Sequence, residues 1–178
     1  MSRWIFGYGS LVWRPDFEYL EARSALARGW ARRFFQGSVD HRGVPGAPGR
    51  VVTLLRHAGS ECWGRAFQVS ATTWDDVVAR LDVREVGGYD QVTLDLELHG
   101  GPPAPARVAA LTYVATERNA NYLGEAPLGE IASQVVRSRG PSGDNVEYVL
   151  RLAEALREMG APDEHVFELE AEVRRRLG

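Results

Sequence analysis

Lysine is absent from this chain: all 21 basic residues among its 178 are arginine. Schiff-base catalysis, a phosphate-binding P-loop and Ser-Lys catalysis each require a lysine amine, so the sequence excludes all three. Arginine can still bind a carboxylate through two parallel hydrogen bonds. The positive charges can therefore hold an acidic group but cannot act as amine nucleophiles.

Cysteine is almost absent, and the histidines are scattered. The single cysteine, Cys62, excludes an internal disulfide and every zinc pattern that needs a cysteine pair. It lies in ECWGRAFQV, which alternates like a strand, and this favours a packed thiol over a nucleophile. The four histidines show no HExxH or other paired spacing, so we expect no metal site.

Long apolar runs and a concentrated basic face are also missing. No apolar run approaches the ~20 residues that span a membrane, and the N-terminus lacks the regions of a signal peptide. The net charge of −3 argues against a dedicated nucleic-acid binder. Together with the lone cysteine, these absences predict a cytoplasmic protein with neither membrane nor nucleic-acid partners.

The order of sequence patterns predicts an α+β fold in one domain over residues 1–178. Alternating or apolar runs predict strands at 4–8, 50–55, 61–69, 91–98 and 107–114, with HAGS at 57–60 as a turn. Residues 24–36 fit a helix or a strand, and their aromatic content favours the strand. Helices are expected at 128–139 after Pro127, at 144–159 before Gly160, and from Asp163 to 177.

Glu85 follows a segment with the spacing of an amphipathic helix. Trp74, Val77, Val78 and Leu81 form one apolar face, and a helix continued at ~100° per residue places Glu85 in the same stripe. A buried carboxylate has a raised pKa, which suits a general acid or base near neutral pH. The alternative is that the helix has already ended and Glu85 is a solvated terminal residue. The charged neighbours Asp75, Asp76, Arg80 and Arg84 fall outside the stripe.

The segment FGYGSL directly follows the first predicted strand. Glycines on both sides of Tyr8 permit close backbone approach, and successive N–H groups in such a turn can bind an anion or a developing oxyanion. A dinucleotide-binding GxGxxG pattern is not met, because the third glycine position is Val12. The alternative is a tight turn that uses glycine for steric reasons alone.

Further polar residues lie in a Gly/Pro-rich segment and near predicted helix starts. Residues 37–50 (GSVDHRGVPGAPGR) form either a lid whose arginine holds a substrate carboxylate or a plain surface connection. Tyr122 lies in NYLGEAPLGE, a second candidate segment. Asn145 is interpreted as a helix cap, and Tyr148 as half-buried packing.

Five segments together resemble the ChaC family of glutathione-specific γ-glutamylcyclotransferases. They run in family order over nearly the whole chain: FGYGSLVWRP, RRFFQGSVDHRGVPGAPGRVVTL, LDVREVGGY, NYLGEAPLGEIA and GPSGDNVEYVL. The YGSL turn is shared by a broader superfamily, whereas the second and fifth segments are more particular to ChaC proteins. The motif around Glu85 departs from the family at Val86, where many members have lysine.

The resemblance implies a small mixed β-barrel with helices around it, and cleavage of glutathione to 5-oxoproline and Cys-Gly without a cofactor. It implies that Glu85 is the catalytic base. Apart from the resemblance, Arg42 in the 37–50 segment and Tyr122 are candidate substrate contacts. The implied substrate-binding loop consists of Gly7, Tyr8, Gly9, Ser10, Leu11 and Val12.

The implied reaction also fits the residues that are missing. The α-amine of the substrate's own γ-glutamyl unit is the nucleophile, so the enzyme needs no lysine, serine or cysteine nucleophile. Two alternatives stay open at this point. The chain could close the same ring on other γ-glutamyl amines, or it could be a non-catalytic module that binds γ-glutamyl metabolites.

Overall fold

The computed structural model describes residues 3–85, 87–102 and 106–178, which form two compact units. One unit comprises the residues up to Ala31 together with Arg56–Val114, and the other comprises Arg32–Leu55 and Ala115–Gly178. The single-domain expectation therefore stays a prediction. The elements in chain order are β1 (Arg3–Gly7), the 3-10 helix η1 (Ser10–Val12), β2 (Glu21–Ser38), β3 (Gly49–Val69), α1 (Trp74–Arg84), β4 (Asp90–His99), β5 (Ala106–Val114), α2 (Leu128–Arg137), β6 (Arg139–Gly140), β7 (Gly143–Asp144), α3 (Asn145–Glu158) and α4 (Glu164–Leu177).

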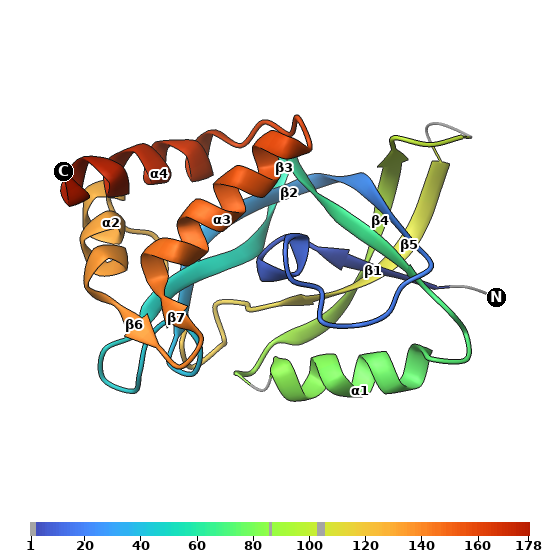
Figure 1. Cartoon of the computed structure of the whole chain (residues 1–178), viewed down its shortest axis with the longest axis horizontal. Coiled ribbons are helices and arrows are strands. Elements are labelled where there is room, and N and C mark those ends of the chain that lie inside the picture. Colours follow the sequence, from blue (N-terminus) through green and yellow to red (C-terminus); the bar gives the residue numbers. More distant parts are fainter. Residues whose placement is uncertain (1–2, 86, 103–105) are drawn as a thin grey trace. The chain divides into compact units, whose positions relative to one another are not determined.

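Five strands form a closed barrel with the order β1-β3-β2-β4-β5 (Figure 1). The end of β2 and the start of β3 belong to the second unit, and the other strand residues belong to the first. Antiparallel ladders join β1 to β3, β2 to β4, and β4 to β5. A short parallel ladder between β1 and β5, with Trp4 opposite Ala110, makes the barrel mixed. The predicted α+β class and mixed barrel are thereby confirmed.

The barrel core explains why these segments become strands. In β4 the alternate residues Leu94, Leu96 and Leu98 are buried, as the period of two in the sequence predicts. Helix α1 presents Val77 and Leu81 to a cluster of barrel side chains. That cluster also contains Ile5, Leu11, Phe67, Val69 and Tyr113. The amphipathic prediction for α1 is confirmed over this part of the segment.

The predicted turn at residues 57–60 is wrong, because β3 is one continuous strand of 21 residues. Gly59 has a φ of 82°, and a glycine in this conformation can bend a strand without ending it. Residues 56–59 are exposed, which accounts for their polar, turn-like composition. The composition thus reflects solvent exposure rather than chain reversal.

Three helices that pack side by side and the short β6–β7 hairpin dominate the second unit (Figure 1). Pro127 immediately precedes α2, as predicted, although the helix ends at Arg137 and the next residues enter β6. Gly160 has a φ of 63° just beyond α3. The carboxylate of Asp163 accepts a hydrogen bond of 3.1 Å from the N–H of Val166, so the predicted cap of α4 is confirmed. Among the described residues, none of the helices is long and apolar enough to cross a membrane.

Candidate active site

The FGYGSL segment folds as the end of β1 followed by one turn of 3-10 helix. The N–H of Val12 bonds to the carbonyl of Gly9 at 3.0 Å, and the side chains of Leu11 and Val12 are buried. A Cβ on Gly7 would lie only 2.7 Å from the Cβ of Leu11. Glycine is therefore required at Gly7 for steric reasons, while Gly9 and Ser10 remain partly exposed. Leu11 and Val12 anchor the turn, and the backbone around Gly9 stays partly exposed.

The hydroxyl group of Tyr8 forms a hydrogen bond within the first unit. Its side chain is buried, and the phenol donates a hydrogen bond of 2.6 Å to the main-chain carbonyl of Tyr113. This bond fixes β1 and the start of the turn against β5. The hydroxyl of Tyr8 therefore stabilises the turn through a buried contact with β5.

Glu85 lies just past the end of α1 and does not continue its helical stripe. The helix ends at Arg84, and Glu85 is the C-cap, whose N–H still bonds to the carbonyl of Leu81 at 2.8 Å. The prediction that the helix continues through Glu85 is wrong. The alternative of a fully solvated end residue does not describe the side chain either, since it is only 21% exposed. The raised pKa expected from the sequence stays a prediction, and Val86 lies outside the described residues.

Arg84 connects the carboxylate to the turn. Its Nη2 donates a hydrogen bond of 2.7 Å to Oγ of Ser10, and its Nε lies 3.8 Å from Oε1 of Glu85. Its Nη1 also bonds to Asp16 Oδ2 at 3.2 Å. The helical wheel placed Arg84 outside the apolar stripe, and its role was missed. The one feature of the sequence that could have pointed to Arg84 is its position immediately before Glu85.

A second polar group, centred on Tyr113, was also missed. Its hydroxyl donates a bond of 2.6 Å to Asp82 Oδ1, which also accepts a bond of 2.6 Å from Gln91 Nε2. Burial raises the pKa of Tyr113, and the bond to Asp82 raises it further, with a smaller contribution from the charge of Glu85. The phenol thus stays protonated, and its hydroxyl lies within electrostatic range of Glu85. No spacing rule marks Tyr113, because it is an ordinary buried strand residue that packs against α1.

The first unit therefore brings together two kinds of group that act in acyl transfer. The turn at Gly9 and Ser10 is partly exposed, and the side chain of Arg84 connects it to the half-buried carboxylate of Glu85. Such an arrangement can stabilise a developing oxyanion and move a proton. Within the described ranges, no three His, Cys, Asp or Glu side chains gather closely enough to hold a metal ion.

Arg42 belongs to the second unit, where its charge already has a partner. The side chain is 7% exposed, and its Nη1 bonds to Glu147 Oε2 at 2.9 Å and to the carbonyl of Asp144 at 3.0 Å. Its own N–H donates to Ser38 Oγ at 2.9 Å. These bonds tie residues 37–50 to the start of α3. The substrate contact expected of Arg42 stays a prediction.

Tyr122 lies in the same unit and is half-buried. Its main chain forms an isolated antiparallel bridge with Gln36. Its hydroxyl makes no hydrogen bond with a described residue. Burial and the charge of Glu117 raise its pKa, while the nearby cation of Arg50 partly opposes that rise.

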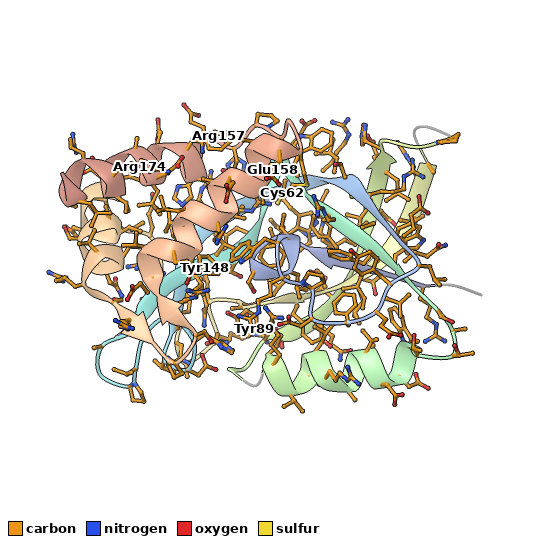
Figure 2. The ribbon with its side chains drawn as sticks, in the orientation of Figure 1. Cys62, Tyr89, Tyr148, Arg157, Glu158 and Arg174 are labelled. Atoms are coloured by element: carbon orange, nitrogen blue, oxygen red, sulfur yellow. The ribbon has the colours of Figure 1, made fainter. Side chains whose placement is uncertain are left out.

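Asn145 does not cap α3, so its interpretation as a helix cap is wrong. It is the first helical residue and is fully buried. Its Oδ1 accepts a bond of 2.6 Å from the N–H of Arg50, and its Nδ2 donates one of 2.8 Å to the carbonyl of the same residue. The amide therefore clamps the backbone of β3 to α3. Tyr148, also on α3 (Figure 2), is more buried than expected and accepts a bond of 3.4 Å from the N–H of Val52.

The barrel and its turn define the class of protein. A crystal structure of a γ-glutamyl cyclotransferase specific to glutathione from yeast superimposes with a TM-score of 0.91 and 26% sequence identity, covering 98% of this chain and 96% of that one. The fold is thus that of the γ-glutamylcyclotransferases.

The particular family follows from the sequence. The family model described as ChaC-like protein matches residues 3–176, and the chain belongs to the ChaC family. It is 48% identical over 167 residues to the human protein named glutathione-specific gamma-glutamylcyclotransferase 1, covering 92% of this chain and 74% of the relative. A Schizosaccharomyces pombe protein named glutathione-specific gamma-glutamylcyclotransferase is 37% identical over 191 residues, covering 99% of this chain and 94% of the relative.

Proposed function

We propose that this chain cleaves the γ-glutamyl bond of reduced glutathione by intramolecular aminolysis, giving 5-oxoproline and Cys-Gly. The observation that carries the mechanism is the link through Arg84, which bonds to Ser10 in the turn and pairs with Glu85. The names of the relatives supply the substrate. The residues present supply a way to carry out the reaction without a bound cofactor.

In the proposed reaction, the substrate provides its own nucleophile. The α-amine of the γ-glutamyl unit attacks the side-chain carbonyl carbon and forms the C–N bond of a five-membered lactam. The C–N bond to cysteine then breaks, and Cys-Gly leaves. Holding the substrate in this attacking conformation is worth up to ~7–11 kcal/mol of the barrier, so the main task of the enzyme is positioning.

Glu85 is proposed to move the proton. As a base it takes a proton from the attacking amine, and as an acid it returns a proton to the nitrogen of the leaving Cys-Gly. One carboxylate can serve both steps because the proton gained in the first is the proton given in the second. The location of Glu85 at the end of α1, only 21% exposed, supports this role.

The turn is proposed to hold the γ-glutamyl carbonyl. Backbone N–H groups near Gly9 would meet the negative charge that develops on the oxygen, worth ~2.7–4 kcal/mol per donor. Tyr8 and Leu11 keep the turn in shape from the buried side. Gly7 permits the close packing that this shape requires.

The remaining proposals concern contacts and location. Arg42 and Tyr122 are retained as candidate substrate contacts of the second unit. We further propose a cytoplasmic location, since reduced glutathione as substrate and a sequence with a single cysteine both suit a reducing compartment. Nucleic acid is not a proposed partner, because the net charge is −3.

Incubation of the purified protein with reduced glutathione tests the function. We expect 5-oxoproline and Cys-Gly to appear in equal amounts. Parallel reactions with other γ-glutamyl amines measure specificity, and comparable turnover of these would replace glutathione by the broader substrate class. Binding of glutathione without any product would instead favour a non-catalytic module.

A further inference from the structure

Arg50, at the start of β3 in the second unit, is a buried cation that forms no ion pair with a described residue. Burial lowers its pKa, and the charge of Glu130 partly opposes that change. Arg50 is 7% exposed, and no carboxylate of the described residues lies within 4.0 Å of its guanidinium group. Its Nε bonds to Gln134 at 2.9 Å, and its Nη1 bonds to the carbonyls of Phe34 and Gly124 at 3.0 and 2.7 Å. Nη2 makes no hydrogen bond with a described residue. Because a buried charge is costly without a counter-ion, this arrangement favours the arrival of an anion.

Gln36, on β2 of the same unit, has a buried acceptor without a donor. The residue is 1% exposed, and its Oε1 has no hydrogen-bond partner among the described residues. Its orientation is fixed, because Nε2 donates to Asn119 Oδ1 at 3.1 Å and that oxygen also accepts from the N–H of Asn121 at 2.8 Å. Rotating the amide of Gln36 would place its oxygen against another oxygen. The unpartnered Oε1 is therefore a feature of the fold.

Tyr122 connects these two side chains. It lies opposite Gln36 in an antiparallel bridge, which places the two side chains next to each other on one face. Two residues further on, the carbonyl of Gly124 accepts the bond from Arg50 Nη1, and a Cβ added to Gly124 would lie 3.6 Å from the Tyr122 ring. The hydroxyl of Tyr122 has no described partner. The cluster thus has two donor groups without a described partner, on Arg50 and Tyr122, and one buried acceptor without a partner, on Gln36.

We propose that Arg50, Tyr122 and Gln36 form a binding site for the carboxyl-terminal residue of a peptide. Arg50 Nη2 and the Tyr122 hydroxyl donate to the terminal carboxylate, and Gln36 Oε1 accepts from the N–H of the same residue. A terminal peptide residue carries both groups a few bonds apart, whereas phosphate or sulfate lacks the N–H that Gln36 needs. Arg42 is the weaker candidate for such a carboxylate, because Glu147 already pairs with it. The choice of glutathione as the peptide rests on the proposed function.

Calorimetric titration of the Glu85→Gln variant, in which turnover is expected to be absent, tests this site. The probes are reduced glutathione and its carboxyl-terminal amide, which differ only at the terminal group: a charged carboxylate in the first and a neutral carboxamide, with an N–H donor in place of one oxygen, in the second. We expect the amide to bind at least about tenfold more weakly, because a charge-assisted hydrogen bond becomes a neutral one. Equal affinities for acid and amide, or no measurable binding of the acid, would overturn the proposal.

The double variant Glu85→Gln/Tyr122→Phe tests whether the glycine carboxylate binds at Tyr122. The hydroxyl has no described partner, so its loss should leave the unfolding free energy unchanged while weakening binding of the acid about three- to tenfold. The affinity of the amide should fall less than that of the acid. The difference between the two losses would place the carboxylate at Tyr122. Tyr19→Phe is the matched control, because Tyr19 is an exposed tyrosine of the first unit.

The outcomes separate this proposal from the proposed function. An acid-to-amide difference that persists unchanged in Tyr122→Phe would place the carboxylate elsewhere and overturn the site, even if wild-type protein produces 5-oxoproline. Loss of that difference in Tyr122→Phe would support the site, even if wild-type protein produces none.

Discussion

The guanidinium group of Arg84 donates a hydrogen bond of 2.7 Å from Nη2 to Oγ of Ser10. This bond joins the last residue of α1 to the first residue of η1, although the two are 74 positions apart in the chain. Because Glu85 is the next residue and its carboxylate lies 3.8 Å from Arg84 Nε, the bond sets where that carboxylate can lie. Arg84 is thus a positioning residue for the proposed acid.

Replacing Arg84 by methionine should slow turnover without unfolding the protein. Loss of the bond to Ser10 lets Glu85 move relative to the turn, and we expect kcat to fall about 10- to 100-fold with a smaller change in KM. Loss of a cation beside the carboxylate should also move the acidic limb of the pH–kcat profile to higher pH. Arg80→Met, an exposed arginine on the same helix, is the control. A change in stability alone, with kcat and pH profile unaltered, would reduce Arg84 to a structural residue.

Replacing Tyr8 by phenylalanine should affect stability more than chemistry. The buried bond of 2.6 Å to the carbonyl of Tyr113 is lost, at a cost of about 1 kcal/mol of unfolding free energy in urea denaturation. Turnover by the folded protein should stay within a few-fold of wild type, since the backbone of the turn binds the carbonyl. A large loss of kcat at normal stability would instead place the phenol in the reaction.

Substitutions at Asn145 separate a backbone clamp from a helix cap. Both amide groups of Asn145 bond to Arg50, so Asn145→Ala should destabilise the protein by roughly 2–4 kcal/mol. Asn145→Ser keeps a side chain that can cap a helix but cannot make both bonds. Urea denaturation should find the serine variant about as unstable as the alanine variant. Recovery of most of the stability by serine would restore the capping interpretation.

His165 should make stability depend on pH between about 4 and 6.5. Burial lowers its pKa to about 4, helped by Arg33 and partly opposed by Asp163, and its Nε2 accepts a bond of 3.1 Å from the N–H of Phe34. The unfolded chain binds a proton below about pH 6.5, whereas the folded protein does so only near pH 4. The contribution of neutral His165 to the unfolding free energy is therefore complete above pH 6.5. It is lost as the pH falls toward 4, by up to about 3 kcal/mol.

Urea denaturation of wild type and His165→Gln at pH 7.5 and 5 measures this effect. Glutamine can still accept the bond from Phe34 but does not titrate. The wild-type protein should lose more stability than the variant on acidification. Parallel losses in both proteins would show that other groups control the acid response.

Periodic burial in the sequence was sufficient to predict most of the strands and helices, whereas the closure of the strands into a barrel was implied by the resemblance to the ChaC family. Alternate leucines in β4 and the spacing of Val77 and Leu81 in α1 report directly which faces are buried. Periodicity failed at residues 57–60, where an exposed strand with a bent glycine has the composition of a turn. It failed again at Glu85, where the helix ends one residue earlier than the wheel assumes.

The contacts within the candidate site could not be predicted in the same way. Arg84 meets Ser10, and Asn145 meets Arg50, only because distant segments of each unit fold together. No local pattern distinguishes Arg84 from Arg80. Local pattern made Glu85 and the turn candidates, the family motifs decided between the alternatives, and the structure added the arginine that links them.

The most direct test of the account compares 5-oxoproline formation from reduced glutathione by wild type, Glu85→Gln and Glu18→Gln. Glutamine keeps the volume and hydrogen bonding of Glu85 but cannot transfer the proton, and Glu18 is an exposed glutamate of the same unit. We predict product from wild type and Glu18→Gln, none above background from Glu85→Gln, and the same far-ultraviolet circular dichroism for all three. Wild-type turnover by folded Glu85→Gln would contradict the account.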